Sequence, residues 1–155
     1  MRLNSAALEN QLDKVRELEN RLTFRLSVVS KLLDQQSQAF LEGTQLNLSS
    51  YRILAVVHTF EHISISDISR FNAMDRAQIS RASVELEKLG LVAFGSDSQS
   101  KRKKMVTLTS QGHAMLKQVQ PKFDDYRRTL EEALGPENLK ALSTGLSRLT
   151  QVVSE

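Results

Sequence analysis

The segment 75–108 constrains the fold most, because it carries helix and strand signals in a fixed order. Asp75 can cap a helix through its side-chain oxygens, and Gln78 follows three residues later, as in a capping box. Apolar or small side chains then recur at helical spacing on one face. They are Ile79, Ala82, Ser83, Leu86 and Leu89. Gly90 follows, and glycine often ends a helix in the left-handed conformation. The sequence therefore predicts a capped amphipathic helix.

Two short strands are predicted directly after this helix. Residues 91–94 and 104–108 are rich in apolar and β-branched side chains, and the loop 95–103 between them is polar. The basic run at the end of the loop consists of Lys101, Arg102, Lys103 and Lys104. Such a run can contact phosphate groups. The alternative is a solvated hairpin whose lysines protect the edge of a sheet.

The outward face of the predicted helix combines hydrogen-bond donors with small side chains. Its polar members are Arg76, Gln78, Ser80 and Arg81. No acidic residue follows Asp75 in the first two turns, which suits a helix that enters a groove of DNA. Residues 46–120 contain ten basic and six acidic side chains, a net charge of +4, whereas the flanking regions are nearly neutral. A basic region indicates a polyanionic partner, although an ordinary solvated face is the alternative.

Composition excludes several classes of protein. The chain has 155 residues, of which 40% are hydrophobic and 5% aromatic, which favours a mainly helical domain with a substantial core. It has no cysteine, and therefore no disulfide, zinc finger or thiol redox switch is expected. It has neither an apolar run long enough to cross a membrane nor the apolar part of a signal peptide. We therefore expect a cytoplasmic protein that does not bind a membrane.

Long helical periodicities flank the central part. Residues 5–34 have apolar side chains every three or four positions, beginning with Leu8, Leu12 and Val15, and predict one helix of about 30 residues, roughly 45 Å long. Thr109 is the predicted cap of another helix, which Gly135-Pro136 breaks. The last helix, from about residue 136 to 153, carries Leu139, Leu142, Leu146 and Leu149. We expect the terminal helices to form a homodimer interface; packing within one chain is the alternative.

The region between them predicts two shorter helices. The first covers about residues 48–62 and the second residues 66–71, with a short β-forming segment at 64–66 and a turn at 72–74. The first helix has Ser49 or Ser50 as its expected cap.

The segment His58-Thr59-Phe60-Glu61-His62 matches a zinc-protease pattern, H-x-x-E-H. That chemistry requires both imidazoles on one helix face, a third protein ligand and an open coordination position. His113 is the only other histidine, and a short helical chain leaves little room for a substrate cleft. We therefore predict no enzyme, metal or cofactor. A metal-responsive regulator that uses His58 and His62 is kept as an alternative.

The order of these elements resembles the multiple-antibiotic-resistance regulator (MarR) family of bacterial transcription factors. The resemblance extends from about Leu48 to Gly112. Its most specific parts are Met74-Asp75-Arg76 through Ser80-Arg81, Leu86-Glu87-Lys88-Leu89-Gly90-Leu91-Val92, and Val106-Thr107-Leu108-Thr109-Ser110-Gln111-Gly112. The flanking helices are similar in kind rather than residue by residue.

The resemblance implies a homodimer that binds pseudo-palindromic double-stranded DNA, usually as a repressor, and that a small aromatic or anionic effector releases. The helix of Arg76, Gln78, Ser80 and Arg81 would read the major groove. Arg102, between Lys101 and Lys103, would enter the minor groove. The family typically has an acidic residue two positions before this arginine, but this chain has Ser100 there; Asp97 is a possible substitute.

The sequence thus predicts a mainly α fold with a small β-hairpin wing, a winged helix-turn-helix with long terminal dimerisation helices. Residues 46–112 are the expected DNA-binding region, and residues 1–45 and 113–155 the helical dimerisation region. An interaction module that retains the winged fold and does not bind DNA is the remaining alternative.

Overall fold

The computed structural model describes residues 5–96 and 104–154. The chain divides into two compact units, residues 1–48 and 49–155. The described elements are helices and one three-stranded antiparallel sheet. This arrangement confirms the predicted fold class, mainly α with a small β wing.

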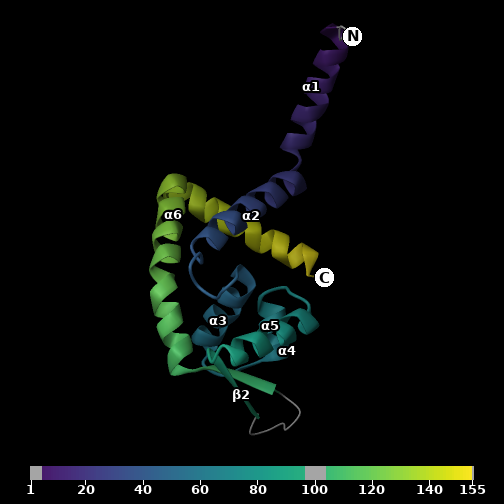
Figure 1. Ribbon diagram of the computed structural model, residues 1–155. Helices are drawn as coiled ribbons and strands as arrows, with labels where there is room; N and C mark the ends of the chain where they lie inside the picture. Colours follow the sequence, from purple (N-terminus) through teal and green to yellow (C-terminus); the bar gives the residue numbers. More distant parts are fainter. Residues whose placement is uncertain (1–4, 97–103, 155) are drawn as a thin grey trace. The chain divides into compact units, whose positions relative to one another are not determined.

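The first unit contains two helices where the sequence predicted one. α1 is Ser5–Asn20 and α2 is Leu22–Ala39. Arg21 separates them because its backbone is extended, with φ −67° and ψ 126°. The prediction of one continuous helix over residues 5–34 was therefore wrong. The Arg21 carbonyl accepts a hydrogen bond from the Arg25 amide at 3.0 Å, so α2 starts a new hydrogen-bonding series at this point. Figure 1 shows α1 and α2 as separate helices.

α3, Leu48–Phe60, belongs to the second unit from Ser49 onward and is followed by the strand β1, Ile63–Ser64, and α4, Ile65–Phe71. Because α3 already starts at Leu48, Ser49 and Ser50 lie within its first turn and neither is its cap. α4 starts one residue earlier than predicted, because Ser64 caps it. The Ser64 hydroxyl accepts from the Asp67 amide at 3.2 Å and donates to the Asp67 carboxylate at 2.6 Å.

α5 is Arg76–Lys88, and both of its predicted ends are confirmed. The Asp75 carboxylate accepts from the amides of Ala77 and Gln78 at 2.9 and 3.1 Å. At the other end Gly90 has φ 71°, and the Leu91 amide donates to the Leu86 carbonyl at 2.9 Å. This hydrogen bond satisfies a carbonyl that the last turn of a helix otherwise leaves without a partner.

The strands β2, Val92–Ser96, and β3, Lys104–Leu108, form the predicted hairpin. β3 is central in the sheet, whose order is β1-β3-β2. Val106 therefore pairs with Phe94 on one side and with Ile63 on the other, and its side chain is fully buried. The third strand was predicted at 64–66 and lies one residue earlier, at Ile63–Ser64.

α6 is Ser110–Val153 and contains one break. Thr109 caps it as predicted, since its hydroxyl accepts from the Gly112 amide at 3.0 Å. Gly135, with φ 71° and ψ 162°, interrupts the helix at the predicted position, and Figure 1 shows the sharp turn there. Pro121 leaves the helical backbone angles of its segment intact.

The core of the second unit joins α3, α4, α5, the sheet and the first part of α6. Its fully buried apolar side chains include Ile53, Leu54, Val57, Ile68, Ile79, Leu86, Val106 and Val119. Phe60 and Phe71 are 42% and 63% exposed and contact one another edge to face. Among the described helices, none combines the length and the apolar character that a membrane span requires.

Candidate nucleic-acid interface

The outer face of α5 presents the side chains that the sequence assigned to base contacts. Arg76, Gln78 and Arg81 are exposed, and Ser80 is partly exposed. The opposite face fixes this orientation, because Ile79 and Leu86 are fully buried on it. A helix anchored along one side can offer its other side to a groove without rotating about its axis.

The arginines of this face have no internal acidic partner. In the described part of the chain, neither Arg76 nor Arg81 makes an ion pair or a side-chain hydrogen bond. The nearest carboxylates in sequence have other partners. That of Asp75, next to Arg76, accepts two amide hydrogen bonds at the helix start. That of Glu85, four residues after Arg81, pairs with Lys88 at 2.7 Å. Both guanidinium groups are thus available to an external acceptor.

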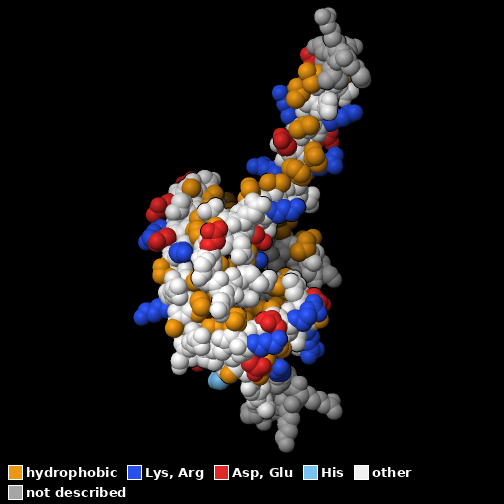
Figure 2. All heavy atoms as spheres, viewed as in Figure 1, with side chains coloured by type: hydrophobic (Ala, Val, Ile, Leu, Met, Phe, Trp, Pro, Cys, Tyr) orange, Lys and Arg blue, Asp and Glu red, His pale blue; other side chains and the backbone are white. Residues whose placement is uncertain are grey.

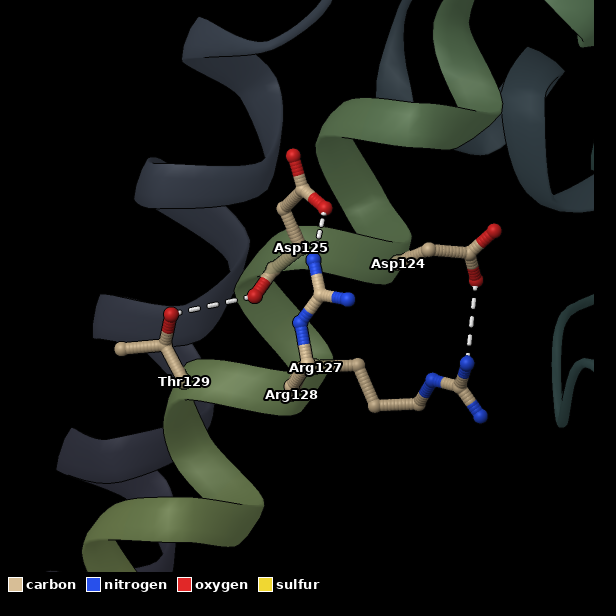
Figure 3. A network of polar contacts seen from close by, with 5 residues as sticks. All are labelled: Asp124, Asp125, Arg127, Arg128 and Thr129. Atoms are coloured by element: carbon tan, nitrogen blue, oxygen red, sulfur yellow. Dashed lines mark hydrogen bonds and ion pairs between the residues drawn. The ribbon is translucent and has the colours of Figure 1, made fainter.

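The arginines of α6 differ in this respect. Figure 3 shows Arg127 paired with Asp124 at 3.2 Å and Arg128 paired with Asp125, each three residues earlier on the same helix. Their charges are partly neutralised within α6. Substitution of one of these ion-paired arginines is therefore a suitable control for substitution of an arginine on α5.

Ser69 fixes the turn between α4 and α5, a role that the sequence did not indicate. Its hydroxyl donates to the Met74 carbonyl at 2.6 Å, and its carbonyl accepts from the Met74 amide at 3.1 Å. Ala73 has φ 48° in this turn. The two bonds across five residues hold the start of α5 against the end of α4. No local sequence pattern distinguishes this serine from its neighbours Ser64 and Ser66.

The base of the hairpin carries one described basic residue, Lys104. Its ammonium nitrogen lies 3.3 Å from the centre of the Phe94 ring on the adjacent strand, a cation–π contact. This lysine is thereby held against the sheet. The other predicted wing residues lie outside the described residues: Lys101, Arg102 and Lys103, with Ser100 and Asp97.

The predicted dimerisation residues lie on α1 and on the last part of α6. On α1, Leu8, Leu12 and Val15 are 44–48% exposed, and Figure 2 shows hydrophobic side chains along this helix between charged ones. Those on α6 are Leu139 and Leu149, which are partly exposed, and Leu142 and Leu146, which are exposed. Their part in a dimer remains a prediction.

The zinc-protease pattern does not have the geometry that its chemistry requires. α3 ends at Phe60, and Glu61 adopts φ 58°, so that His62 lies beyond the helix. His58 and His62 are therefore not successive ligands on one helix face.

A capped α4, a fixed turn, a capped α5 and an antiparallel hairpin define the chain as a winged helix-turn-helix protein. Residues 44–103 match the model of the MarR family, described as "MarR family". Over this region the chain is similar to the MarR family of winged-helix regulators.

Relatives and solved structures agree with this assignment. The transcriptional regulator Hpr of Geobacillus thermodenitrificans is 27% identical over 64% of this chain and 50% of its own length. The transcriptional activatory protein BadR of Rhodopseudomonas palustris is 26% identical over 95% of this chain and 85% of its own. The MepR–DNA complex of S. aureus has a TM-score of 0.79 at 20% identity, covering 87% of this chain and 98% of that one, and thus supports the fold.

The chain spans about half the length of the first curated relatives it matches, 50% and 47%. The matching family and the named relatives are transcriptional regulators and not enzymes.

Proposed function

We propose that this protein is a homodimeric, sequence-specific DNA-binding regulator of transcription. The observation that carries the proposal is the outer face of α5, where Arg76, Gln78 and Arg81 are exposed and both arginines lack an acidic partner among residues 5–96 and 104–154. A bidentate arginine can bind the O6 and N7 atoms of guanine, and glutamine can bind the edge of adenine. Ser80 is smaller and lies within reach of the same groove.

The remaining parts of the chain have supporting roles in this proposal. Residues 46–112 bind DNA, with Lys101, Arg102 and Lys103 contributing charge at the wing. Residues 1–45 and 113–155 hold two copies together, so that the recognition helices meet half-sites about 10 bp apart.

The protein acts in the cytoplasm by binding rather than by catalysis. It represses its target promoter until a small aromatic or anionic effector weakens DNA binding. The similarity of residues 44–103 to the MarR family supports this part of the proposal.

Substitution of Arg81 tests base recognition. A bidentate contact to guanine contributes about 1–3 kcal/mol of discrimination, so Arg81→Ala should lower specific affinity by roughly 5- to 150-fold. It should also relax the preferred sequence at one position of each half-site. Selection from a random DNA library followed by gel-shift titration at fixed salt measures both quantities.

Arg127→Ala is the matched control, because it removes the same charge from an exposed, ion-paired site on α6. It should leave the preferred sequence unchanged. If Arg81→Ala selects the same sequence as the wild type, Arg81 has no role in base recognition. If the wild type binds selected and random DNA equally, sequence-specific binding is ruled out.

A further inference from the structure

All three histidines of the chain line one pocket in the second unit. His58 lies in the last turn of α3, His62 between α3 and β1, and His113 four residues after the cap of α6. The pocket has a volume of about 260 Å³, and its wall is completed by Val57, Glu61, Thr107 and Leu108. Histidines from separate segments of the sequence thus meet at the junction of α3, β3 and α6.

Two of the imidazoles already have the spacing of shared metal ligands. The ring centres of His58 and His113 are 5.5 Å apart, and the ring planes are inclined by 79°. Zinc binds imidazole nitrogen at about 2.0–2.1 Å in tetrahedral geometry, which separates the centres of two bound rings by about 5 Å. The separation of the two rings is therefore compatible with a shared ion.

The chain reverses at Glu61 in a way that brings a carboxylate and a third imidazole to the same pocket. Glu61 has φ 58°, which is uncommon for a residue with a side chain, and the His62 amide donates to the Phe60 carbonyl at 2.6 Å. Without this reversal α3 would continue past Phe60. Unusual backbone conformations of this kind occur preferentially at functional sites.

The histidine and glutamate side chains that line this pocket could bind an ion without breaking hydrogen bonds of the fold. Within residues 5–96 and 104–154, the three imidazoles and the Glu61 carboxylate make no side-chain hydrogen bond or ion pair. All four residues are exposed. A bound ion would thus meet free donors without breaking contacts of the fold.

We propose that His58, His62 and His113, with Glu61, bind one divalent transition-metal ion such as Zn²⁺ or Ni²⁺. Imidazole nitrogens and a carboxylate oxygen are suitable ligands for these ions. As the side chains lie, no three His, Asp or Glu residues among the described ones are close enough to hold an ion. His62 and Glu61 therefore rotate toward the His58–His113 pair on binding. The ion then joins the end of α3 to the start of α6, beside the base of the wing.

The site is tested with the full chain, freed of metal by chelator and titrated with Zn²⁺ and with Ni²⁺ in a calorimeter. We expect one ion per chain. Removing one imidazole ligand should weaken binding at least about tenfold, and we expect this loss for His58→Asn, for His62→Asn and for His113→Asn. Glu87→Gln on α5, an exposed acid outside the pocket, should bind like the wild type.

Nuclear magnetic resonance of the wild type gives a second readout that requires no variant. Because the chain has three histidines, its spectrum contains three sets of imidazole signals. All three should change together and saturate at one equivalent of Zn²⁺. The proposal is overturned if neither ion binds at one equivalent, if His113→Asn binds as tightly as the wild type, or if the imidazole signals do not respond. None of these outcomes bears on DNA binding by α5.

Discussion

Tyr51 of α3 and Phe123 of α6 form a stacked pair with ring centres 3.8 Å apart and planes inclined by 10°. The Tyr51 side chain is partly buried. Burial raises the pKa of its phenol above the ordinary value of 10.0, and the negative charge of Asp124 raises this pKa further. Both effects disfavour the phenolate in the folded protein.

This raised pKa predicts a loss of stability in alkali. Because the folded pKa exceeds the unfolded one, the stabilising contribution is complete below about pH 10 and disappears as pH rises through the folded pKa. Urea unfolding at about pH 8 and about pH 11 measures this loss. The wild type should lose more stability between the two pH values than Tyr51→Phe does. Tyr126→Phe, which removes the other phenol, is the control and should lose as much as the wild type. An equal loss in the wild type and in Tyr51→Phe would contradict the assignment of this effect to Tyr51.

At the scale of elements, α6 starts in very close contact with the beginning of β2. A Cβ atom on Gly112 would lie 2.0 Å from the Leu91 carbonyl oxygen and 3.2 Å from the Leu108 side chain. A backbone atom cannot move aside as the end of a side chain can. Only glycine therefore fits this position without displacing the helix from the sheet.

Two glycine substitutions on α6 should have opposite effects. Gly112→Ala should lower the free energy of unfolding by about 1–3 kcal/mol through overpacking. Gly145→Ala should raise it by roughly 0.5–1 kcal/mol, because a Cβ there meets nothing within 4 Å and alanine favours the helix. Chemical denaturation of both variants measures the difference. Equal effects of the two substitutions would show that the Leu91 contact does not limit the position.

Most helix ends could be predicted from the sequence, because their signals are local. The side chains of Asp75 and Thr109 bond amides two or three residues away, and Gly90 and Gly135 adopt positive φ. The break at Arg21 has no such signal. The apolar periodicity continues through it, and no side chain caps the helix that follows.

The candidate site was only partly predictable for a related reason. The outward position of Arg76 and Arg81 follows from helical periodicity within one segment. The approach of His113 to His58 depends on how α6 packs against α3, and 55 positions separate the two residues. No pattern within either segment carries that information.

At the scale of the whole molecule, assembly is predicted to depend on exposed apolar side chains. Leu142 and Leu146 lie one turn apart on the last part of α6, each 44% exposed. In a dimer this stripe would be removed from water. A charged side chain placed there would then be buried without a partner, at considerable cost in free energy.

Leu146→Glu should therefore weaken the dimer more than about tenfold, equivalent to at least ~1.4 kcal/mol. Thr144→Glu introduces the same charge on the opposite face of this helix and should leave the association unchanged. Sedimentation equilibrium over a range of protein concentrations measures both constants. If Leu146→Glu associates as tightly as Thr144→Glu, this stripe is not part of the dimer interface.

The contacts around Thr109 have a mechanical consequence. Its hydroxyl donates to the Gly90 carbonyl at 2.6 Å, and its amide donates to the Leu91 carbonyl at 3.1 Å. The first turn of α6 is thus bonded directly to the two residues that follow the C-terminal cap of α5. Because these hydrogen bonds connect the two helices without a flexible linker, a tilt of α6 at this end should move the C-terminal end of α5. A compound that binds α6 before the break at Gly135 and tilts this part of the helix would thereby change the angle at which α5 meets DNA.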